Sequence, residues 1–208
     1  MKTSNEKIFV IDDDESVRRS LPMLLESMEF EVETFPSSED FLNREPFNGT
    51  GCILLDINLG GKSGLELQEE LINKQYSLPI IFITGKGGVP ESVRALKKGA
   101  VDFLQKPFDD QQLLDAVEEA VAKSHTIRKE FDELKKLQGL ISVLTERELE
   151  VFKYVVTGML NKQIAQELNI TEHTVKLHRG KITEKLGVKS VAELVLIAEK
   201  LGIQSPVQ

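Results

Sequence analysis

The sequence is poor in cysteine and has no long apolar run. Its 208 residues include one cysteine, Cys52, which excludes an intrachain disulfide. Cys52 lies inside an apolar run, as expected of a core residue in a reducing compartment. No apolar stretch approaches the about 20 residues of a membrane-spanning helix, and the polar N-terminus lacks the apolar segment of a secretory signal. We therefore expect a cytoplasmic protein with no membrane partner.

Acidic residues exceed basic residues, but the excess is confined to the first part of the chain. Residues 1–139 carry a net charge of −9, whereas residues 140–208 carry +1. Five cations cluster in this second part, with Glu184 as the acid among them: Lys176, Arg179, Lys181, Lys185 and Lys189. A local basic stripe favours nucleic-acid binding more directly than the overall charge of a chain does.

Residues 1–106 alternate short apolar runs with stretches of helical periodicity. The alternation occurs five times, which is typical of a parallel sheet covered by helices on both faces. Phe30–Val32 begins a run expected to form an edge strand, and Gly99 is expected to stop a helix. We predict an α/β domain with a five-stranded, parallel, doubly wound sheet of flavodoxin-like topology.

Four of the apolar runs are each followed at once by side chains that can bind a phosphate or a cation. They are the acids Asp12, Asp13 and Asp14, the lone acid Asp56, the hydroxyl of Thr84 and the ammonium group of Lys106. If the runs are neighbouring parallel strands, their carboxyl ends meet in the crevice where open α/β sheets bind ligands. This combination predicts a phosphorylatable aspartate.

Each of these residues also has a structural interpretation when taken singly. The run from Asp12 to Glu15 could form the N-terminus of a helix, where acids are favoured. Asp56 could be a cap, Thr84 and Lys106 could be solvated loop residues, and Phe103 could be a core residue. A sheet edge needs no such combination for stability, so the combination favours function.

Two enzyme classes can be tested against the residues that follow Asp56. Gly61-Lys62-Ser63 resembles the end of a phosphate-binding loop, but the Walker pattern needs a glycine where Asp56 stands. A phosphatase of the haloacid dehalogenase type needs an acid at position 58, and Asn58 cannot serve as a general acid. A scaffold that is never phosphorylated remains as an alternative, which phosphodonor labelling of Asp56 would exclude. We therefore expect a protein that is not an enzyme.

The segment after Pro107 predicts a long helix, because residues 110–138 contain no proline or glycine. Apolar or small residues repeat there at alternating spacings of four and three: Leu113, Val117, Ala120, Ser124, Ile127, Phe131 and Leu134. This stripe could pair with another helix, or its first half could pack on the sheet while its second half is a solvated spacer. We expect domains at residues 1–122 and 140–208, joined by a helical linker at residues 123–139.

The tail predicts four short helices. Thr145-Glu146-Arg147-Glu148 has the form of a capping box, and Asn161 is expected to cap a second helix. A tight turn leads into a third helix from Glu172 to Leu186, and Ser190 is expected to cap a fourth. Two short helices joined by a three-residue turn, the later one basic, indicate a helix-turn-helix whose recognition helix enters the major groove of DNA.

Together these motifs resemble a known family. The first domain resembles a response-regulator receiver, and the tail is similar to the all-α, four-helix DNA-binding domain of NarL/LuxR-type regulators. The whole layout is most similar to FixJ-like transcriptional activators. The motifs that carry the resemblance are Val10-Ile11-Asp12-Asp13, Leu54-Leu55-Asp56, Ile83-Thr84-Gly85, Lys106-Pro107-Phe108, Leu144 to Glu148, Asn161 to Ala165 and Thr174 to Arg179.

The resemblance implies that a sensor histidine kinase phosphorylates Asp56 in the presence of Mg²⁺. It places the Mg²⁺ ligands at Asp12, Asp13, Asp56 and the backbone carbonyl of Asn58. A hard cation with oxygen ligands would relieve the repulsion among these carboxylates. Thr84 and Lys106 would contact the phosphoryl group, Phe103 would be a rotating aromatic switch, and the Lys106-Pro107 bond would be cis. Gly60 departs from the family pattern, which commonly has proline there, and predicts a more mobile loop.

In the tail, the resemblance implies a recognition helix from Glu172 to Leu186 with Val175, Ile182 and Leu186 toward the core. The expected DNA-binding residues are His173, Thr174, Lys176, Leu177, Arg179, Gly180, Lys181 and Lys185. Lys176 is the expected contact to a base, guanine being the base that lysine favours. Phosphorylation would promote a homodimer that binds double-stranded operator DNA and, with RNA polymerase, activates transcription.

Overall fold

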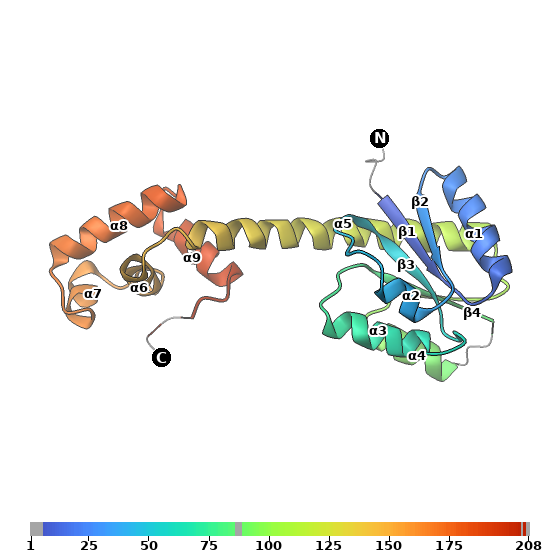
Figure 1. The fold of residues 1–208 in the computed structure, drawn as a ribbon. Helices are drawn as coiled ribbons and strands as arrows, with labels where there is room; N and C mark the ends of the chain where they lie inside the picture. The colour runs from blue at the N-terminus through green and yellow to red at the C-terminus, as the bar shows by residue number, and fades with distance from the viewer. Residues whose placement is uncertain (1–5, 86–88, 205, 207–208) are drawn as a thin grey trace. The chain divides into compact units, whose positions relative to one another are not determined.

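The computed structural model describes residues 6–85, 89–204 and 206. The chain divides into two compact units, residues 1–129 and residues 130–208 (Figure 1). In the described residues no helix is long and apolar enough to cross a membrane.

The first unit contains a parallel sheet with the strand order β2-β1-β3-β4-β5. The strands are β1 (Glu6–Ile11), β2 (Glu31–Phe35), β3 (Thr50–Asp56), β4 (Ile80–Thr84) and β5 (Asp102–Gln105). The chain runs from β1 outward to the edge strand β2 and then crosses to β3 on the other side of β1. Such a reversal opens a crevice outside the carboxyl ends of the strands. The predicted five-stranded flavodoxin-like sheet is confirmed.

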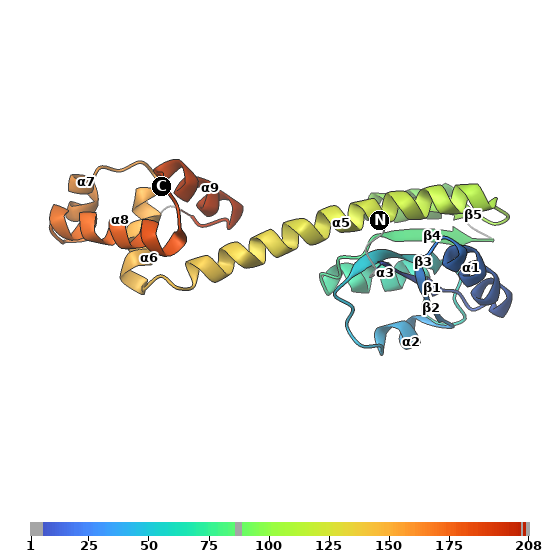
Figure 2. The ribbon, with the colours of Figure 1, turned by 90° about the horizontal axis from the view of Figure 1, so that it is seen from above.

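Helices cover both faces of this sheet (Figures 1 and 2). The helices that begin in this unit are α1 (Glu15–Ser27), α2 (Ser38–Leu42), α3 (Gly64–Asn73), α4 (Val89–Lys97) and α5 (Asp110–Ile141). Successive strand residues point to opposite faces, so Phe9 packs in the core with α2, α3 and α4, whereas Ile8 packs in the core with α1 and α5. The central strands are buried on both sides and are therefore held rigidly beneath the crevice.

The first residues of the apolar stripe predicted along α5 are buried in the core of the first unit. Leu113, Val117, Ala120 and Ser124 are all buried in the first unit. The hydroxyl of Ser124 accepts a hydrogen bond from the backbone N–H of Gly51 at 3.1 Å. Beyond them, Phe131 and Leu134 are 53% and 39% exposed. The first half of the stripe therefore packs on the sheet, which leaves no apolar face there for a second helix.

Position 51 requires glycine for this contact. A Cβ atom at Gly51 would lie 1.8 Å from the carbonyl oxygen of Lys7 on the neighbouring strand. The close approach of β1 and β3 at this point leaves the N–H of Gly51 directed at Ser124. The start of β3 and α5 are thereby joined by a hydrogen bond within the core.

The second unit is helical. Its helices are the end of α5, α6 (Glu146–Val155), α7 (Asn161–Glu167), α8 (Glu172–Leu186) and α9 (Val191–Lys200). Thr145 and Ser190 cap α6 and α9 as predicted, and Thr145 forms the expected capping box with Glu148. Val175, Ile182 and Leu186 are buried, which confirms the inner face predicted for α8. Leu137 and Ile141 of α5 pack against the same core.

The predicted cap of α7 is wrong by one residue. The N-cap is Leu160, whose backbone N–H donates a hydrogen bond to the side-chain oxygen of Gln163 at 2.8 Å. Asn161 is the first residue of the helix, and its side-chain oxygen accepts a hydrogen bond from Arg179 at 3.0 Å. The polar group of Asn161 therefore joins α7 to α8 instead of capping α7.

Candidate functional site

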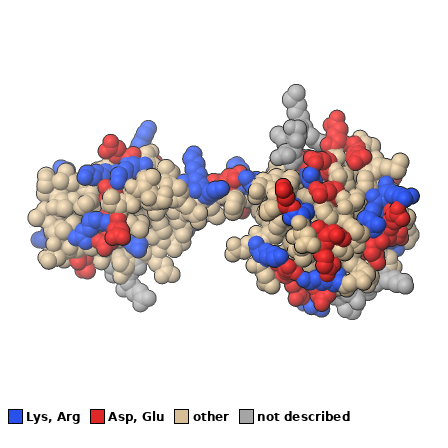
Figure 3. Space-filling model, viewed as in Figure 1, with Lys and Arg blue, Asp and Glu red and all other residues tan. Residues whose placement is uncertain are grey.

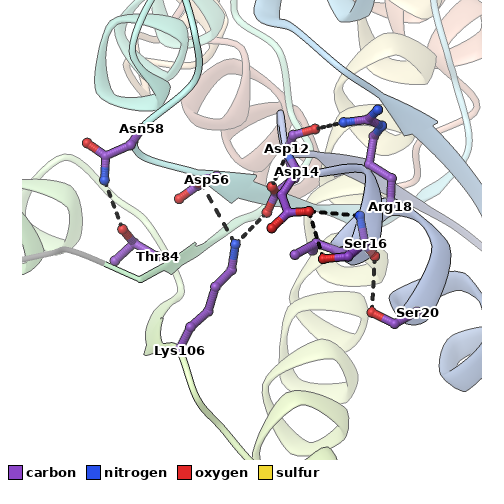
Figure 4. A network of polar contacts seen from close by, with 10 residues as sticks. Asp12, Asp14, Ser16, Arg18, Ser20, Asp56, Asn58, Thr84 and Lys106 are labelled. Carbon is purple, nitrogen blue, oxygen red and sulfur yellow. Dashed lines mark hydrogen bonds and ion pairs between the residues drawn. The ribbon is translucent and has the colours of Figure 1, made fainter.

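The side chains predicted to gather at the carboxyl edge of the sheet do so. Asp12 follows β1, Asp56 ends β3, Thr84 ends β4 and Lys106 follows β5. Figure 4 shows the ammonium group of Lys106 directed between Asp56 and Asp12. The strand order places β1 and β3 side by side, so their terminal acids line the crevice at the point where the connections reverse.

Three carboxylates lie close enough to hold one metal ion. Asp12, Asp13 and Asp56 each offer an oxygen, and these oxygens all lie within 4.8 Å of one another. Asp12 and Asp56 are buried, whereas Asp13 is exposed. Buried and open ligands in one cluster suit a hard cation that enters from solvent and keeps some of its water.

Asp14 does not belong to this cluster. Its carboxylate caps α1 by accepting hydrogen bonds from the backbone N–H of Ser16 at 2.8 Å and from the Ser16 hydroxyl at 2.7 Å. These bonds, the hydroxyl bond first, lower the pKa of Asp14. The acidic run therefore serves two purposes. Asp12 and Asp13 lie in the crevice, whereas Asp14 caps the N-terminus of a helix.

Asp56 has one buried oxygen without a partner. Among the described residues nothing forms a hydrogen bond with its Oδ1 atom. Burial raises the pKa of Asp56; Lys106 lowers this pKa, and the charge of Asp12 raises it. A buried carboxylate oxygen that lacks a partner costs free energy in a fold. Its presence at the base of an acidic crevice fits a group that receives a cation or a phosphoryl group.

Lys106 brings a positive charge into the crevice. Its ammonium nitrogen lies 2.6 Å from Oδ2 of Asp12 and 3.9 Å from Oδ2 of Asp56. The backbone N–H of Lys106 donates to the carbonyl of Thr84 at 2.8 Å, which fixes the start of its side chain beside β4. The Lys106-Pro107 bond is cis, as the family resemblance implied.

A side-chain contact joins the loop after β3 to the end of β4. The amide of Asn58 donates a hydrogen bond to the hydroxyl of Thr84 at 3.2 Å. Thr84 is buried, and Phe103 is half-buried against the core formed with α2, α3 and α4. The sequence indicated a role for the backbone carbonyl of Asn58 but gave no sign of this bond, because the two residues are 26 positions apart.

Gly64 is a residue of the site that the sequence patterns missed. A Cβ atom there would lie 2.2 Å from the carbonyl oxygen of Asp56, so α3 can start beside Asp56 only with glycine. The N–H of Gly64 donates to the carbonyl of Ile57 at 2.9 Å, and Ser63 caps the helix. The available sign was a glycine at the first helical residue after a serine cap.

The second unit presents the predicted DNA-binding helix α8 with its expected residues in different environments. His173, Lys176, Leu177, Gly180 and Lys181 are exposed. Thr174 and Arg179 are half-buried, and Arg179 donates to Asn161. In the view of Figure 3 most acidic side chains lie on the first unit, in agreement with the net charge of −9 of residues 1–139.

Lys185, also predicted to contact DNA, has partners within its own unit. Its ammonium nitrogen lies 2.6 Å from a carboxylate oxygen of the buried Glu148 and 3.2 Å from the carbonyl oxygen of Val143. The hydrogen bond from Lys185, followed by one from the backbone of Thr145, lowers the pKa of Glu148 to about 2. Lys185 thus ties the end of α8 to the start of α6.

Comparison with known proteins gives a match to each unit. Residues 8–118 match the family described as response regulator receiver domain. Residues 142–205 match the family described as bacterial regulatory proteins, luxR family. The chain is 45% identical to nodulation protein W of Bradyrhizobium diazoefficiens, over 95% of this chain and 87% of that protein. It is 43% identical to the transcriptional regulatory protein TdiR of Thauera aromatica, over 93% and 86% of the two chains.

Solved structures agree with this assignment. The response regulator StyR is similar with a TM-score of 0.81 and 46% identity, over 94% of this chain and 99% of that chain. Full-length FixJ from B. japonicum is similar with a TM-score of 0.58 and 35% identity, over 97% and 99% of the two chains. Receiver domains typically bind Mg²⁺ at an acidic cluster such as that of Asp12, Asp13 and Asp56. The chain therefore belongs to the two-component response regulators that combine a receiver with a LuxR-type DNA-binding domain, a family of transcription regulators whose partners are sensor histidine kinases and DNA.

Proposed function

We propose that phosphorylation of Asp56 by a sensor histidine kinase switches this regulator from a monomer to a DNA-binding dimer. The observation that carries the proposal is the unpartnered, buried Oδ1 atom of Asp56 among Asp12, Asp13 and Lys106. A carboxylate oxygen of Asp56 would form a bond to phosphorus while the phosphorus–nitrogen bond of a phosphohistidine breaks. The carboxylate of Asp56 is ionised and loses no proton, and the imidazole of the kinase leaves in its neutral, protonated form.

The acidic cluster fits Mg²⁺ as the cofactor of this step. Asp12, Asp13, Asp56 and the backbone carbonyl of Asn58 would hold the ion, which supplies positive charge next to the transferred group. Because Asp13 is exposed, the ion can reach the crevice without opening of the fold.

The contacts of Thr84 and Lys106 indicate how the switch operates. A phosphoryl group on Asp56 accepts hydrogen bonds, so Thr84 donates its hydroxyl to the group and Lys106 pairs with another of its oxygens. Thr84 then leaves the amide of Asn58, and Lys106 leaves Asp12. Phe103 lies on β5, which pairs with β4, and rotates inward as Thr84 moves. The charge change is thereby transmitted to one face of the receiver.

The dimer surface is the face formed by α4, β5 and the start of α5. Val93 and Leu96 of α4 are 44% and 45% exposed, so the surface already offers apolar side chains. A phosphorylation-dependent shift of Phe103 and of the segments around it would complete this surface. Two recognition helices would then reach half-sites about one DNA turn apart.

The test of the switch is the mass of the full chain in solution, measured by chromatography with light scattering. With Mg²⁺ and a phosphodonor or beryllofluoride the wild type becomes a dimer, whereas Asp56→Asn stays a monomer with an intact fold. Asp40→Asn removes a similar charge from α2, outside the crevice, and dimerises normally. Donor-dependent dimerisation of Asp56→Asn, or an absence of phosphoryl label on the wild type, contradicts the proposal and favours an unphosphorylated scaffold.

The output of the switch is sequence-specific binding of duplex DNA through α8. His173, Lys176, Leu177 and Gly180 would lie toward the bases, and Thr174 would also contact the DNA. Arg179, Lys181 and Lys185 would lie toward phosphates or the rim of the interface. Lys185 would do so while its bond to Glu148 holds the end of α8 in place. The bound dimer would act with RNA polymerase to activate transcription.

Lys176 tests this output. Lys176→Ala should weaken binding to an operator selected by the activated wild type by roughly tenfold, the effect of losing one base contact. Lys153→Ala removes the same charge from α6 and serves as the control. Equal operator affinity of the wild type and Lys176→Ala at one fixed salt concentration would remove the assigned role.

A further inference from the structure

Gly180 stands at a position where the fold itself gives no reason for glycine. It lies inside α8, six residues before the helix ends at Leu186. Glycine is the least favourable residue in a helix interior apart from proline. An added Cβ at Gly180 would meet nothing within 4 Å in the described part of the chain, apart from the helix backbone and chain neighbours. Folding alone would therefore favour alanine.

Three other glycines have structural explanations. Gly187, which follows α8, has a φ of 64°, a left-handed conformation that favours glycine. Gly64 and Gly51 are each required by an approaching carbonyl oxygen. Gly180 has neither feature, because its backbone is helical and its surroundings are open.

Gly180 lies on the outer face of α8, one turn beyond Lys176 and Leu177. Residues three and four positions apart are neighbours on a helix surface, so these three share one face. Leu177 is 55% exposed, and the buried residues of α8 lie on the other side. The hydroxyl of Thr183 donates to the carbonyl of Gly180 at 2.8 Å, so the turn around the glycine is hydrogen-bonded. The face therefore has a flat position, without a side chain, directly beside its predicted base contacts.

We infer that Gly180 is a specificity-determining residue, because it lets the backbone of α8 approach DNA more closely than any side chain at this position would allow. The inference rests on the proposed binding of duplex DNA by α8. An α-helix fits the major groove with little space to spare, so a missing Cβ decides how deeply the helix enters. A deeper helix brings Lys176 and the exposed apolar side chain of Leu177 within reach of base edges and thymine methyl groups.

Gly139 provides a matched control. It lies near the end of α5, also in a helix, and a Cβ there would likewise meet nothing within 4 Å in the described residues. Its carbonyl accepts a hydrogen bond from the hydroxyl of Ser142 at 2.8 Å, as the carbonyl of Gly180 does from Thr183. Gly139→Ala and Gly180→Ala are therefore the same chemical change in similar local surroundings, the first outside α8 and the second inside it.

The experiment uses the full chain, activated with Mg²⁺ and beryllofluoride, and an operator selected by the wild type from random duplexes. Gly180→Ala should lower operator affinity roughly tenfold, comparable to one mismatched base pair, and Gly180→Leu should lower it further. Binding to an unrelated duplex stays unchanged, since that binding depends on phosphate contacts. Gly139→Ala binds the operator as the wild type does, and neither alanine variant melts at a lower temperature.

The outcomes separate this inference from the proposed function. If the wild type selects no operator, the proposed function fails, and the inference fails with it. If the wild type selects an operator that Gly180→Ala binds equally well, the inference alone is overturned. Tighter operator binding by Gly180→Lys would also overturn it, since a larger side chain would then be accommodated.

Discussion

The ammonium group of Lys106 lies 2.6 Å from a carboxylate oxygen of Asp12, which is closer than its 3.9 Å distance to Asp56. The lysine therefore balances the charge of a predicted metal ligand more directly than that of the predicted phosphoryl acceptor. A divalent ion held by Asp12 would compete with this ammonium group, because both would bind the same buried carboxylate. In the proposed switch Lys106 therefore changes partners.

We predict that Lys106→Met binds Mg²⁺ more tightly than the wild type does. Removing a partly screened ion pair is worth about 1 kcal/mol, so the affinity should rise roughly fivefold. Isothermal titration calorimetry measures the change. Lys62→Met is the control, because Lys62 lies in the loop after Asp56 but pairs with Glu70. An unchanged or weaker Mg²⁺ affinity of Lys106→Met would show that the ion and the lysine do not compete.

Asn58→Ala should favour the activated state. The amide of Asn58 donates a hydrogen bond to the hydroxyl of Thr84 in this structure, and in the proposed switch that hydroxyl turns toward the phosphoryl group. Loss of one neutral hydrogen bond is worth about 0.5–1.5 kcal/mol, so beryllofluoride affinity should rise roughly two- to tenfold. Mg²⁺ affinity should not change, because the predicted metal contact is the backbone carbonyl of Asn58.

A double-mutant cycle tests whether Asn58 acts through Thr84. In a Thr84→Ala background the hydroxyl is absent, so Asn58→Ala should no longer change beryllofluoride affinity. A change of equal size in both backgrounds would place the effect of Asn58 elsewhere.

Gly64→Ala should destabilise the receiver. Its Cβ would lie 2.2 Å from the carbonyl oxygen of Asp56 and 3.1 Å from Cγ of Leu55, so β3 and α3 must separate. Overpacking of this kind costs about 1–3 kcal/mol. Gly61→Ala, in the loop that precedes α3, is the control, since a Cβ there meets nothing within 4 Å in the described residues and the cost stays within about 0.5 kcal/mol. Urea unfolding measures both, and equal midpoints would contradict the steric argument.

The arrangement of the crevice could be predicted from the sequence because each of its side chains directly follows a buried strand. Parallel strands bring their carboxyl ends to one edge, so Asp12, Asp56 and Thr84 meet whatever the length of the intervening helices. The capping box of Thr145 was equally predictable, because its partner is three residues away. In both cases the positions of the residues along the sequence are enough to predict that their side chains meet in the fold.

Contacts between distant residues had no such pattern. The side chain of Asn161 has the chemistry of a cap, but Arg179, 18 residues later, binds it in the folded unit. The same limit applies to Lys185, which resembles an exposed recognition-helix cation until Glu148 is seen beside it. Gly64 is required by a carbonyl that approaches only after β3 and α3 have packed. Tertiary packing, which propensity and spacing do not encode, decides these cases.

The pair of Glu148 and Lys185 should make the second unit sensitive to acid. The pKa of Glu148 falls from its ordinary 4.5 to about 2 in the folded state, chiefly through Lys185. A carboxyl with a lowered folded-state pKa adds stability above its unfolded pKa, and this stability is lost as the pH falls. We therefore predict a loss of stability between pH 4.5 and pH 2. The loss should be much smaller in Glu148→Gln, which cannot titrate.

Urea titrations followed by the NMR resonances of α6 and α8 would measure this dependence. Glu150→Gln is the control, since Glu150 is on the same helix and pairs with Arg147 at the surface. At neutral pH Lys185→Met should also lower the stability of the unit, because Glu148 would remain buried without its cation. Equal acid sensitivity of Glu148→Gln and the wild type would remove the pair as its source.

Helix α5 contributes side chains to a core at each of its ends, since Ser124 is buried in the receiver and Leu137 packs in the DNA-binding unit. A chimaera that joins this receiver to another output module would thus need its junction between these two residues. A junction before Ser124 would leave the N–H of Gly51 without its hydrogen-bond acceptor. A junction after Leu137 would remove a side chain that packs against the core of the output module. In this chain, modular exchange is thereby confined to about three helical turns of sequence.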